Sequence, residues 1–351
     1  LATYYSNRGY AWEPQHIVVG PGSKELLFDL FYLLSGVLLL PVPSWVSYYP
    51  QAHLVGKDVV PVASNSHYKI TPEGLIESVA KARSLGKSGE QLILLLNSPN
   101  NPSGGAYAEE ELKALAEVAR QNDIIIIADE IYAEVSYDSD IAPSIYKYIP
   151  ENTIVTGGLS KAFSAGGYRL GFLAMPSQIS EQLSSGLKAM ISETFSCVSA
   201  PIQYAAVTAY SDNSEINEYV QLCSEIHRIM GRHIQKLLLE YNINCPDIMG
   251  AFYLFPDFNQ YKEQLLMRSI KDSMTLCERI LEEAGVALLP AQDFGLPADY
   301  YACRLASVDY DGEMLIESKK IGASDAELVE LAPNVTKGCV ALGEWVAQLP
   351  K

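Results

Sequence analysis

The chain has 351 residues, of which 48% are hydrophobic and 19% are charged, a balance typical of a globular protein with a sizeable core. Its formal net charge of −17 argues against a nucleic-acid partner, which would require a basic face. Six cysteines are scattered without a CxxC pair, so we expect no metal site and no disulfide framework, and a reducing cytoplasm fits best. The longest apolar run, 25–43, is interrupted by Asp29 and Gly36 and is too short to span a bilayer.

Between about residues 15 and 200, apolar strands alternate with helices, which predicts an α/β domain with a largely parallel sheet. Four consecutive isoleucines in segment 123–132 indicate a strand that is covered on both faces. Segment 108–122 is predicted to be an amphipathic helix, because acidic residues fill its first turn, where the helix dipole favours them. The other predicted elements are a helix at 23–34 and strands at 16–20, 37–45, 57–62, 91–104 (running into a loop), 153–158 and 170–176.

The remainder of the chain predicts a smaller α+β domain. It contains a long amphipathic helix at 215–245, a second helix at 271–284, and apolar segments at 250–258, 286–291 and 301–310. We expect one domain over residues 1–220 and the other over 221–351.

Polar motifs stand at the ends of three predicted strands, where ligands of open parallel sheets bind. Asn101 lies in the loop after 92–97, Asp129 ends the polyisoleucine strand with Tyr132 three residues later, and Lys161 follows 153–158. A Gly-rich turn at 20–25 opens a helix, whose backbone amides and dipole make an anion site.

A phosphorylated heteroaromatic aldehyde would use all of these groups. Lysine forms a Schiff base with an aldehyde, and an aspartate keeps a proton on a ring nitrogen because its negative charge favours the cationic form. Asparagine and tyrosine can hydrogen-bond a ring hydroxyl, while the helix N-terminus and an arginine can hold the phosphate.

The segment GLSKAFSAGGYRLG (158–171) resembles the lysine signature of the fold-type-I, pyridoxal-phosphate-dependent aminotransferases of class I/II. The motifs PSWVSY (43–48), NNPSG (100–104) and ADEIY (128–132) match that family in order and spacing, and the resemblance extends over nearly the whole chain. It implies the type I fold, with a mostly parallel seven-stranded sheet between helices and a smaller C-terminal domain. It also implies pyridoxal 5′-phosphate as cofactor and a homodimer with active sites at its interface.

The resemblance further implies roles for individual residues. Lys161 would form the Schiff base and shuttle the proton between the substrate Cα and the cofactor. Asp129 would pair with the pyridine nitrogen, while Tyr132 and Asn101 would bond the ring oxygen. Trp45 would stack on the ring.

Another set of residues is implied to bind the phosphate and the substrate. Ser23 and Lys24 by their backbone, Ser160 by its hydroxyl and Arg169 by its guanidinium would hold the phosphate. Arg304 would clamp the substrate α-carboxylate, which the planar fork of arginine suits, with Asn101 beside it.

The stretch GSKELLF (22–28) resembles the aspartate and glutamate–prephenate aminotransferase subgroup, in which the lysine meets the distal carboxylate of a dicarboxylic substrate. We therefore expect Lys24 to bind substrate, and a ping-pong transfer from aspartate to 2-oxoglutarate. The alternatives are an aminotransferase for alanine, aromatic or kynurenine-type substrates, a β-eliminating lyase, and a non-catalytic sensor domain.

Some parts of the chain lack a counterpart or a signal. The family usually has an N-terminal arm before the stretch that matches residue 1, so we expect either that N-terminal residues are missing here or that the chain is a degenerate relative. Segment 314–334 matches nothing in the family pattern and is interpreted as an insertion near the substrate entrance. Arg8 carries no functional signal, and His53, His67 and His227 are interpreted as surface or packing residues.

Overall fold

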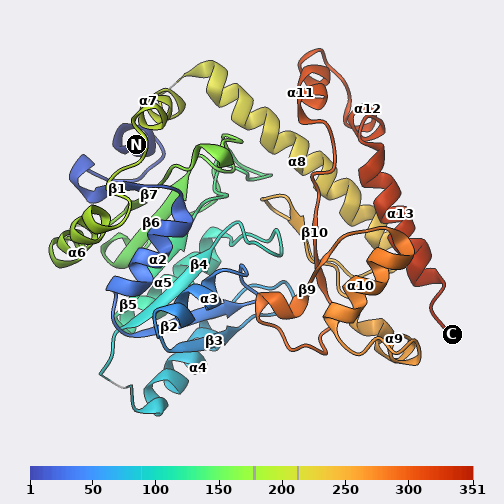
Figure 1. The fold of residues 1–351 in the computed structure, drawn as a ribbon, viewed down its shortest axis with the longest axis horizontal. Coiled ribbons are helices and arrows are strands. Elements are labelled where there is room, and N and C mark those ends of the chain that lie inside the picture. Colours follow the sequence, from blue (N-terminus) through green and yellow to red (C-terminus); the bar gives the residue numbers. More distant parts are fainter. Residues whose placement is uncertain (88, 177–178, 212, 351) are drawn as a thin grey trace.

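The structure is a computed structural model that describes residues 1–87, 89–176, 179–211 and 213–350. It has a larger part around a seven-stranded sheet and a smaller part at the other end of the molecule (Figure 1). Within these described ranges, no helix is both long enough and apolar enough to cross a membrane.

Seven strands form the sheet of the larger part. Their bounds are β1 Ile17–Gly20, β2 Val37–Val42, β3 Val59–Ala63, β4 Leu92–Asn97, β5 Ile124–Asp129, β6 Thr153–Gly158 and β7 Gly171–Ala174. The order is β1-β7-β6-β5-β4-β2-β3, in which β3, β2, β4, β5 and β6 are parallel while β7 is antiparallel to both β6 and β1. The predicted α/β class with a mostly parallel sheet is confirmed.

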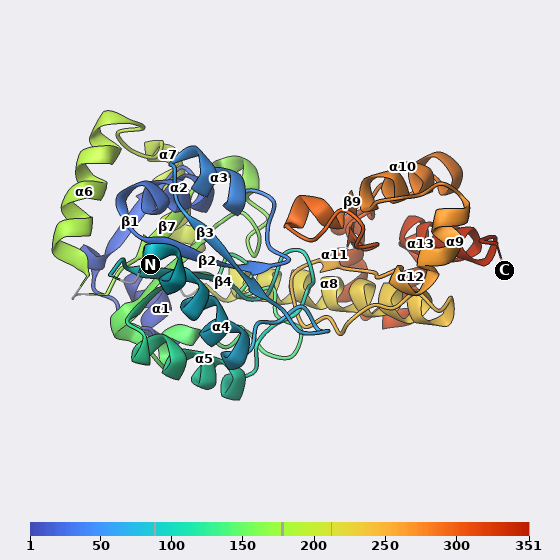
Figure 2. The same ribbon diagram turned by 90° about the horizontal axis from the view of Figure 1, so that it is seen from below.

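Helices cover both faces of this sheet (Figure 2). On one face lie α4 (Pro72–Ala82) and α5 (Glu109–Gln121), and on the other α2 (Ser23–Leu33), α3 (Tyr48–Leu54) and α6 (Ser180–Glu193). Successive side chains of a strand point to opposite faces, so Ile124 and Ile126 join the core under α4 and α5, whereas Ile127 joins the core under α2. The isoleucine run is therefore buried on both sides, as its composition predicts.

Two predicted strands end three residues earlier than expected. The strand from residue 37 stops at Val42, and the backbone N–H of Ser44 donates to the carbonyl of Phe294 in the smaller part, 3.0 Å away. The polyisoleucine strand stops at Asp129, because the chain turns there and the N–H of Glu130 bonds the carbonyl of Thr156. In both places the chain leaves the sheet at its carboxyl edge.

The smaller part has a three-stranded antiparallel sheet in the order β8-β10-β9, with helices packed around its core. Its elements are β8 Tyr253–Leu254, α9 Lys262–Met267, α10 Ser273–Ala284, β9 Leu289–Pro290, β10 Cys303–Ala306, α11 Gly312–Lys320, α12 Asp325–Glu330 and α13 Pro333–Ala347. Segment 314–334 falls within α11 to α13, and α11 and α12 pack along helix α8 (Ser214–Glu240).

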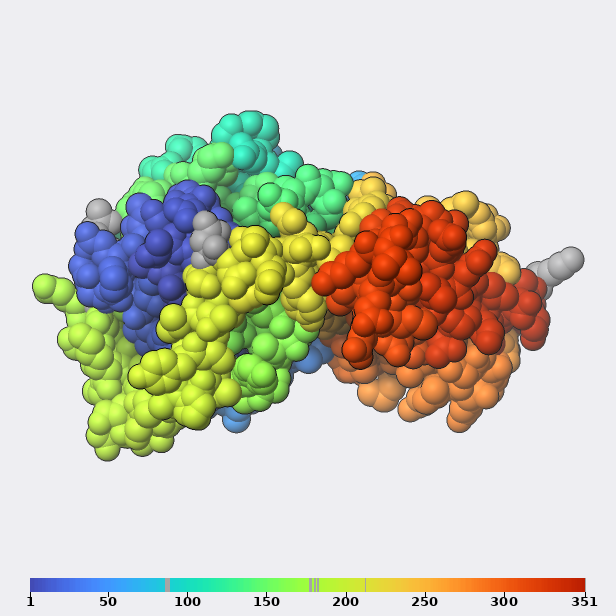
Figure 3. Space-filling model, turned by 90° about the horizontal axis from the view of Figure 1, so that it is seen from above, coloured from blue at the N-terminus to red at the C-terminus, as the bar shows by residue number. Residues whose placement is uncertain are grey.

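Helix α8 runs without a break from the larger part into the smaller one, as the yellow residues in Figure 3 show. Val220 packs against Val135 and Ala162 of the larger part, whereas Ile226 and the buried residues after it join the core of the smaller part. The expected domain boundary between residues 220 and 221 lies inside this helix and stays a prediction.

The chain before β1 and after α6 contributes an aromatic cluster at the β1–β7 end of the sheet. Helices α1 (Ala2–Ser6) and α7 (Ala200–Ala209) belong to it. The ring of Tyr5 lies 5.1 Å from that of Phe172, and the ring of Tyr4 lies 5.1 Å from that of Tyr210. This cluster attaches the first residues of the chain to the edge of the sheet.

A close backbone approach between β7 and α2 generates a first prediction. A Cβ atom on Gly171 would lie 2.2 Å from the backbone nitrogen of Ser23, so Gly171→Ala must push the start of α2 away from the sheet. We expect the free energy of unfolding to fall by about 1–3 kcal/mol in chemical denaturation. Gly167→Ala is the control, because a Cβ there meets no atom within 4 Å. Equal stability of the two variants would contradict this packing argument.

Candidate active site

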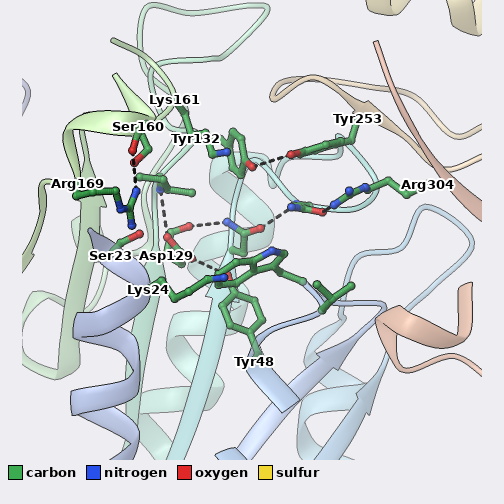
Figure 4. A pocket seen from close by; sticks show the side chains of 16 residues that line it. Ser23, Lys24, Tyr48, Asp129, Tyr132, Ser160, Lys161, Arg169, Tyr253 and Arg304 are labelled. Atoms are coloured by element: carbon green, nitrogen blue, oxygen red, sulfur yellow. Dashed lines mark hydrogen bonds between the residues drawn. The ribbon is translucent and has the colours of Figure 1, made fainter. Parts of the chain in front are cut away.

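A cavity of ≈ 510 Å³ lies where the carboxyl ends of β4, β5 and β6 meet the start of α2 and the smaller part (Figure 4). Its volume is within the range of small-molecule and cofactor sites. Every residue that the sequence singled out as a candidate lines it: Ser23, Lys24, Trp45, Asn101, Asp129, Tyr132, Ser160, Lys161, Arg169 and Arg304. Residues from seven separate segments of the chain therefore converge on one cavity, while segment 314–334 contributes none of its described lining.

One end of the cavity can hold an anion. Helix α2 begins at Ser23 after Gly22, whose φ of 101° belongs to the region that favours glycine. The Arg169 guanidinium donates to the carbonyls of Gly166 at 2.7 Å and Pro21 at 3.2 Å. A Cβ on Gly22 would lie 2.3 Å from Arg169 Nη2, so glycine allows the guanidinium to lie against the start of the helix. Free helix amides and a guanidinium together suit a phosphate.

Asp129 is buried in the floor of the cavity and has partners on both carboxylate oxygens. Its Oδ2 accepts from the Tyr48 hydroxyl at 2.6 Å, and its Oδ1 accepts from Thr156 Oγ1 at 3.2 Å and the N–H of Ile131 at 3.3 Å. Burial raises the pKa of Asp129, while these hydrogen bonds, that of Tyr48 foremost, oppose the shift by favouring the charged form. The Asp129 carboxylate is therefore suited to accept a hydrogen bond from a positively charged N–H group.

Lys161 directs its amine into the cavity opposite Asp129 (Figure 4). Its Nζ lies 5.6 Å from the centre of the Tyr132 ring and 5.4 Å from that of Phe252. Burial lowers the pKa of Lys161, the positive charge of Arg304 lowers it further, and Asp129 opposes both effects. Because a lowered pKa increases the neutral fraction of an amine, Lys161 is favoured as a nucleophile and as a base.

A chain of contacts connects Tyr132 with the arginine of the smaller part. The Tyr132 hydroxyl donates to that of Tyr253 at 3.3 Å, and the guanidinium carbon of Arg304 lies 4.5 Å from the centre of the Tyr253 ring. Arg304 Nη1 donates to Asn101 Oδ1 at 3.0 Å. Burial raises the pKa of Tyr132, so its hydroxyl keeps its proton and can donate. Arg304 is held on two sides and presents its remaining donors to the cavity.

Lys24 and Trp45 form another wall. The ammonium of Lys24 lies 4.8 Å from the centre of the Trp45 ring, a cation–π distance, while its carbonyl accepts from Gln51. The Trp45 ring meets Tyr48 edge to face at 5.1 Å. The side chain of Lys24 is therefore placed beside the cavity and is not engaged in an ion pair with any described residue.

Several lining residues were missed from the sequence. Tyr48 is the last residue of the PSWVSY motif, and the motif itself was the signal for it. Asn97 ends β4, and the rule that singled out Asp129 at the end of β5 applies equally to it. Its amide donates to the Asp129 carbonyl at 2.8 Å, and its Oδ1 accepts from the N–H of Asn101 at 2.8 Å. Tyr253 lies in β8 of the smaller part, and no motif in the sequence marked it.

Comparisons with known proteins show the family and the fold of the chain. The family model "Aminotransferase class I and II" matches residues 1–309. The aspartate aminotransferase of Geobacillus stearothermophilus is 32% identical over 317 residues, which cover 88% of this chain and 76% of that protein. The structure of Thermus thermophilus aspartate aminotransferase with maleate has a TM-score of 0.79 at 24% identity, covering 98% of this chain and 79% of that one. The aromatic aminotransferase of Pyrococcus horikoshii has a TM-score of 0.78 at 26% identity, covering 98% and 84%.

The hydrogen bond from Tyr48 to Asp129 generates a second prediction. Tyr48→Phe removes the donor that most strongly opposes protonation of Asp129, so the pKa of Asp129 rises further. The charged carboxylate is present above that pKa and is lost as the pH falls through it. We expect the variant to bind pyridoxal phosphate on the order of ten-fold more weakly, since hydrogen bonds to charged groups contribute about 1.5–3 kcal/mol.

The affinity for pyridoxal phosphate is measured by absorbance titration at neutral pH and at mildly acidic pH. The loss of affinity in Tyr48→Phe is expected to be larger at mildly acidic pH. Tyr49→Phe is the matched control, because the neighbouring Tyr49 is 58% exposed. A Tyr48→Phe variant that binds the cofactor as tightly as Tyr49→Phe at both pH values would show that the bond does not tune Asp129.

Proposed function

The chain belongs to the class I and II aminotransferases, pyridoxal-phosphate-dependent enzymes that act on amino acids and 2-oxo acids, and we propose that its amino donor is aspartate and its acceptor 2-oxoglutarate. One observation carries the choice of substrate. Lys24 and Arg304 both line the cavity that contains Lys161, so two cations are available for the two carboxylates of a dicarboxylic acid.

The residues of the cavity fit pyridoxal phosphate. The cradle in which a Cβ on Gly22 would collide with Arg169 suits the phosphate, with Ser23 and Lys24 offering backbone N–H groups and Ser160 a hydroxyl. The buried Asp129 suits a protonated ring nitrogen. When bound, the cofactor supplies an aldehyde that reacts with amines and a ring that accepts the electron pair released at the substrate Cα.

The proposed positioning of the ring uses four side chains. Asp129 would accept a hydrogen bond from the ring N–H, and its charge would keep that proton in place. Tyr132 and Asn101 would hydrogen-bond the ring oxygen, and Trp45 would pack on the ring. Support for Tyr132 comes from its burial and raised pKa, because a phenol that keeps its proton remains a donor.

Lys161 moves the proton. In its neutral form, Nζ takes the proton from the substrate Cα as a general base and later returns a proton as a general acid. The lowered pKa of Lys161 supports this role, since a base must be unprotonated to accept. Burial of the amine between the rings of Tyr132 and Phe252 also limits competing proton exchange with water.

Arg304 is proposed to bind the α-carboxylate and Lys24 the distal one. Asn101 and the Tyr253 ring hold the guanidinium of Arg304 in place before substrate arrives. Such preorganisation reduces the entropy that binding would otherwise cost. The Lys24 ammonium, resting on the Trp45 ring, is a mobile point charge that can follow the distal carboxylate.

We further propose a homodimer and a cytoplasmic location. The side chains of Tyr204 and Val207 on α7 are 77% and 70% exposed and line an apolar groove of ≈ 450 Å³ with Leu170, close to Arg169. A second copy of the chain is the proposed cover for this groove. The six cysteines are all free in the structure, which supports a reducing compartment.

A third prediction tests the cofactor chemistry. The protein with pyridoxal phosphate is expected to show a visible absorbance band of the lysine-bound cofactor, which aspartate bleaches and 2-oxoglutarate restores. Lys161→Ala removes the amine and should lose the band, whereas the exposed Lys81→Ala should keep it. A band that persists in Lys161→Ala would assign the amine to another residue.

A fourth prediction tests the dicarboxylic substrate. Lys24→Ala is expected to lower kcat/KM for aspartate by roughly 10- to 100-fold, because one ionic contact to the distal carboxylate is lost. Turnover of alanine, which has no distal carboxylate, should change little. The choice of aspartate would be wrong if turnover of aspartate and alanine fell equally in Lys24→Ala. It would also be wrong if an aromatic amino acid were a better donor than aspartate. Neither result would contradict the aminotransferase activity.

A further inference from the structure

The aromatic ring of Phe252 contacts both Lys161 and a histidine that does not line the catalytic cavity. Its centre is 5.4 Å from Lys161 Nζ and 5.1 Å from the centre of the His227 ring. Phe252 also contacts the rings of Tyr132 at 5.5 Å and Tyr253 at 4.7 Å, both of which line the catalytic cavity. The ring is thus part of the wall behind the lysine amine.

A second cavity, of ≈ 530 Å³, adjoins this wall on the side of His227. Helix α8, the loop that follows Lys161 and the chain after β10 surround it. The lining residues are Ser164, Tyr219, Cys223, Ile226, His227, Val308, Tyr310, Gly312, Glu313, Ile316, Glu317 and Lys320. Because Ser164 lies only three residues after Lys161, the two cavities approach each other around this loop.

His227 is held in a defined orientation. Its Nδ1 lies 2.7 Å from the Tyr310 hydroxyl. Burial raises the pKa of Tyr310 and lowers that of His227 to about 4, so near neutral pH the phenol keeps its proton and the imidazole is neutral. A neutral imidazole donates at one nitrogen and accepts at the other, so the tautomer of His227 sets which of the two groups donates in this hydrogen bond.

The same stretch of chain also holds the backbone of Phe252. The carbonyl of Phe252 accepts from the N–H of Ser307 at 3.0 Å and from the Ser307 hydroxyl at 3.2 Å. Ser307 and Tyr310 are three residues apart, so this segment fixes Phe252 directly through its carbonyl and indirectly through the His227 ring. Ring packing against His227 and hydrogen bonds from Ser307 to its carbonyl therefore both hold Phe252 in place.

We propose that His227 is a positioning residue for the aminotransferase reaction: oriented by Tyr310, it supports the Phe252 ring as a partition beside the Lys161 amine and so keeps water from that side of the amine. The proposal rests on the proton-transfer role proposed for Lys161. Phe252 contacts the amine directly, whereas His227 acts through Phe252.

Burial is the largest influence on the pKa of Lys161, which gives the partition a measurable consequence. Opening the wall admits water, which stabilises the charged form and moves the protonation midpoint to higher pH. Two sets of charges surround the wall. Around Lys161 they are Arg304, Asp129, Arg169 and Lys24, and around the second cavity Glu313, Glu317 and Lys320. None of them is changed by a substitution at His227.

The test compares holoenzyme variants by steady-state kinetics and by the pH titration of the visible band, which reports protonation of Lys161 Nζ in its bond to the cofactor; burial disfavours the positive charge on this nitrogen just as it does on the free amine. His227→Ala, which removes the supporting ring, is expected to move the midpoint to higher pH and to lower kcat by between a few-fold and about 100-fold, with a smaller change in KM. His227→Phe restores an aromatic ring of similar size and should return the midpoint most of the way. Tyr310→Phe keeps the ring of residue 310 and removes only the hydrogen bond, so an intermediate shift is expected.

His233→Ala is the matched control, since His233 lies on the same helix and bonds Thr336 in the smaller part, 2.9 Å away. A His227→Ala midpoint equal to that of His233→Ala would overturn the proposal. If His227→Ala failed to fold, an unshifted midpoint in Tyr310→Phe, with unchanged kcat, would overturn it instead. A wild-type protein without a band that responds to amino acids would refute the proposed function, which is a separate outcome.

Discussion

Parallel pairing of β4, β5 and β6 is the constraint on which the rest of the site depends. The register places Asn97 beside Asp129 and Asp129 beside Thr156, so three polar side chains form a row at the carboxyl edge of the sheet. Strand side chains alternate with a period of two, so a slip of one residue would turn Asp129 to the other face. Such a slip would also take Asp129 away from the hydroxyls of Tyr48 and Thr156, to which it is hydrogen-bonded.

The second constraint is the burial of opposite charges in one cavity. Burial raises the pKa of Asp129 and lowers that of Lys161, which pushes both groups toward their neutral forms. Hydrogen bonds to Asp129 oppose this and favour its charge, whereas the neighbouring cation Arg304 adds to the effect on Lys161. Hydrogen bonds that favour a charged acid and burial that favours a neutral amine both suit a proton-transfer site with a cationic ring.

The smaller part completes the site from a distance. Arg304 and Asn101 are 203 positions apart in the sequence, yet they are joined by a hydrogen bond of 3.0 Å. Helix α8 carries residues of both parts on one rigid element, and His227 lies on it where the two cavities adjoin. The same helix thus links the two cores and supports the proposed partition behind Lys161.

Composition, strand alternation and four motifs were enough to determine the fold class and the family, because a buried parallel strand and a glycine-rich anion loop have local sequence requirements. They also singled out residues that gather in one cavity, although the roles of these residues stay predictions. Tertiary structure alone decided three contacts: the Tyr253 ring with the Arg304 guanidinium, the Tyr48 hydroxyl with the Asp129 carboxylate, and the His227 ring with the Phe252 ring. Each of these contacts joins segments that are far apart in the chain, and the local pattern of a sequence does not specify which distant side chain fills a given space. For that reason the sequence alone assigned His227 to surface or packing, whereas its neighbours in space point to the lysine.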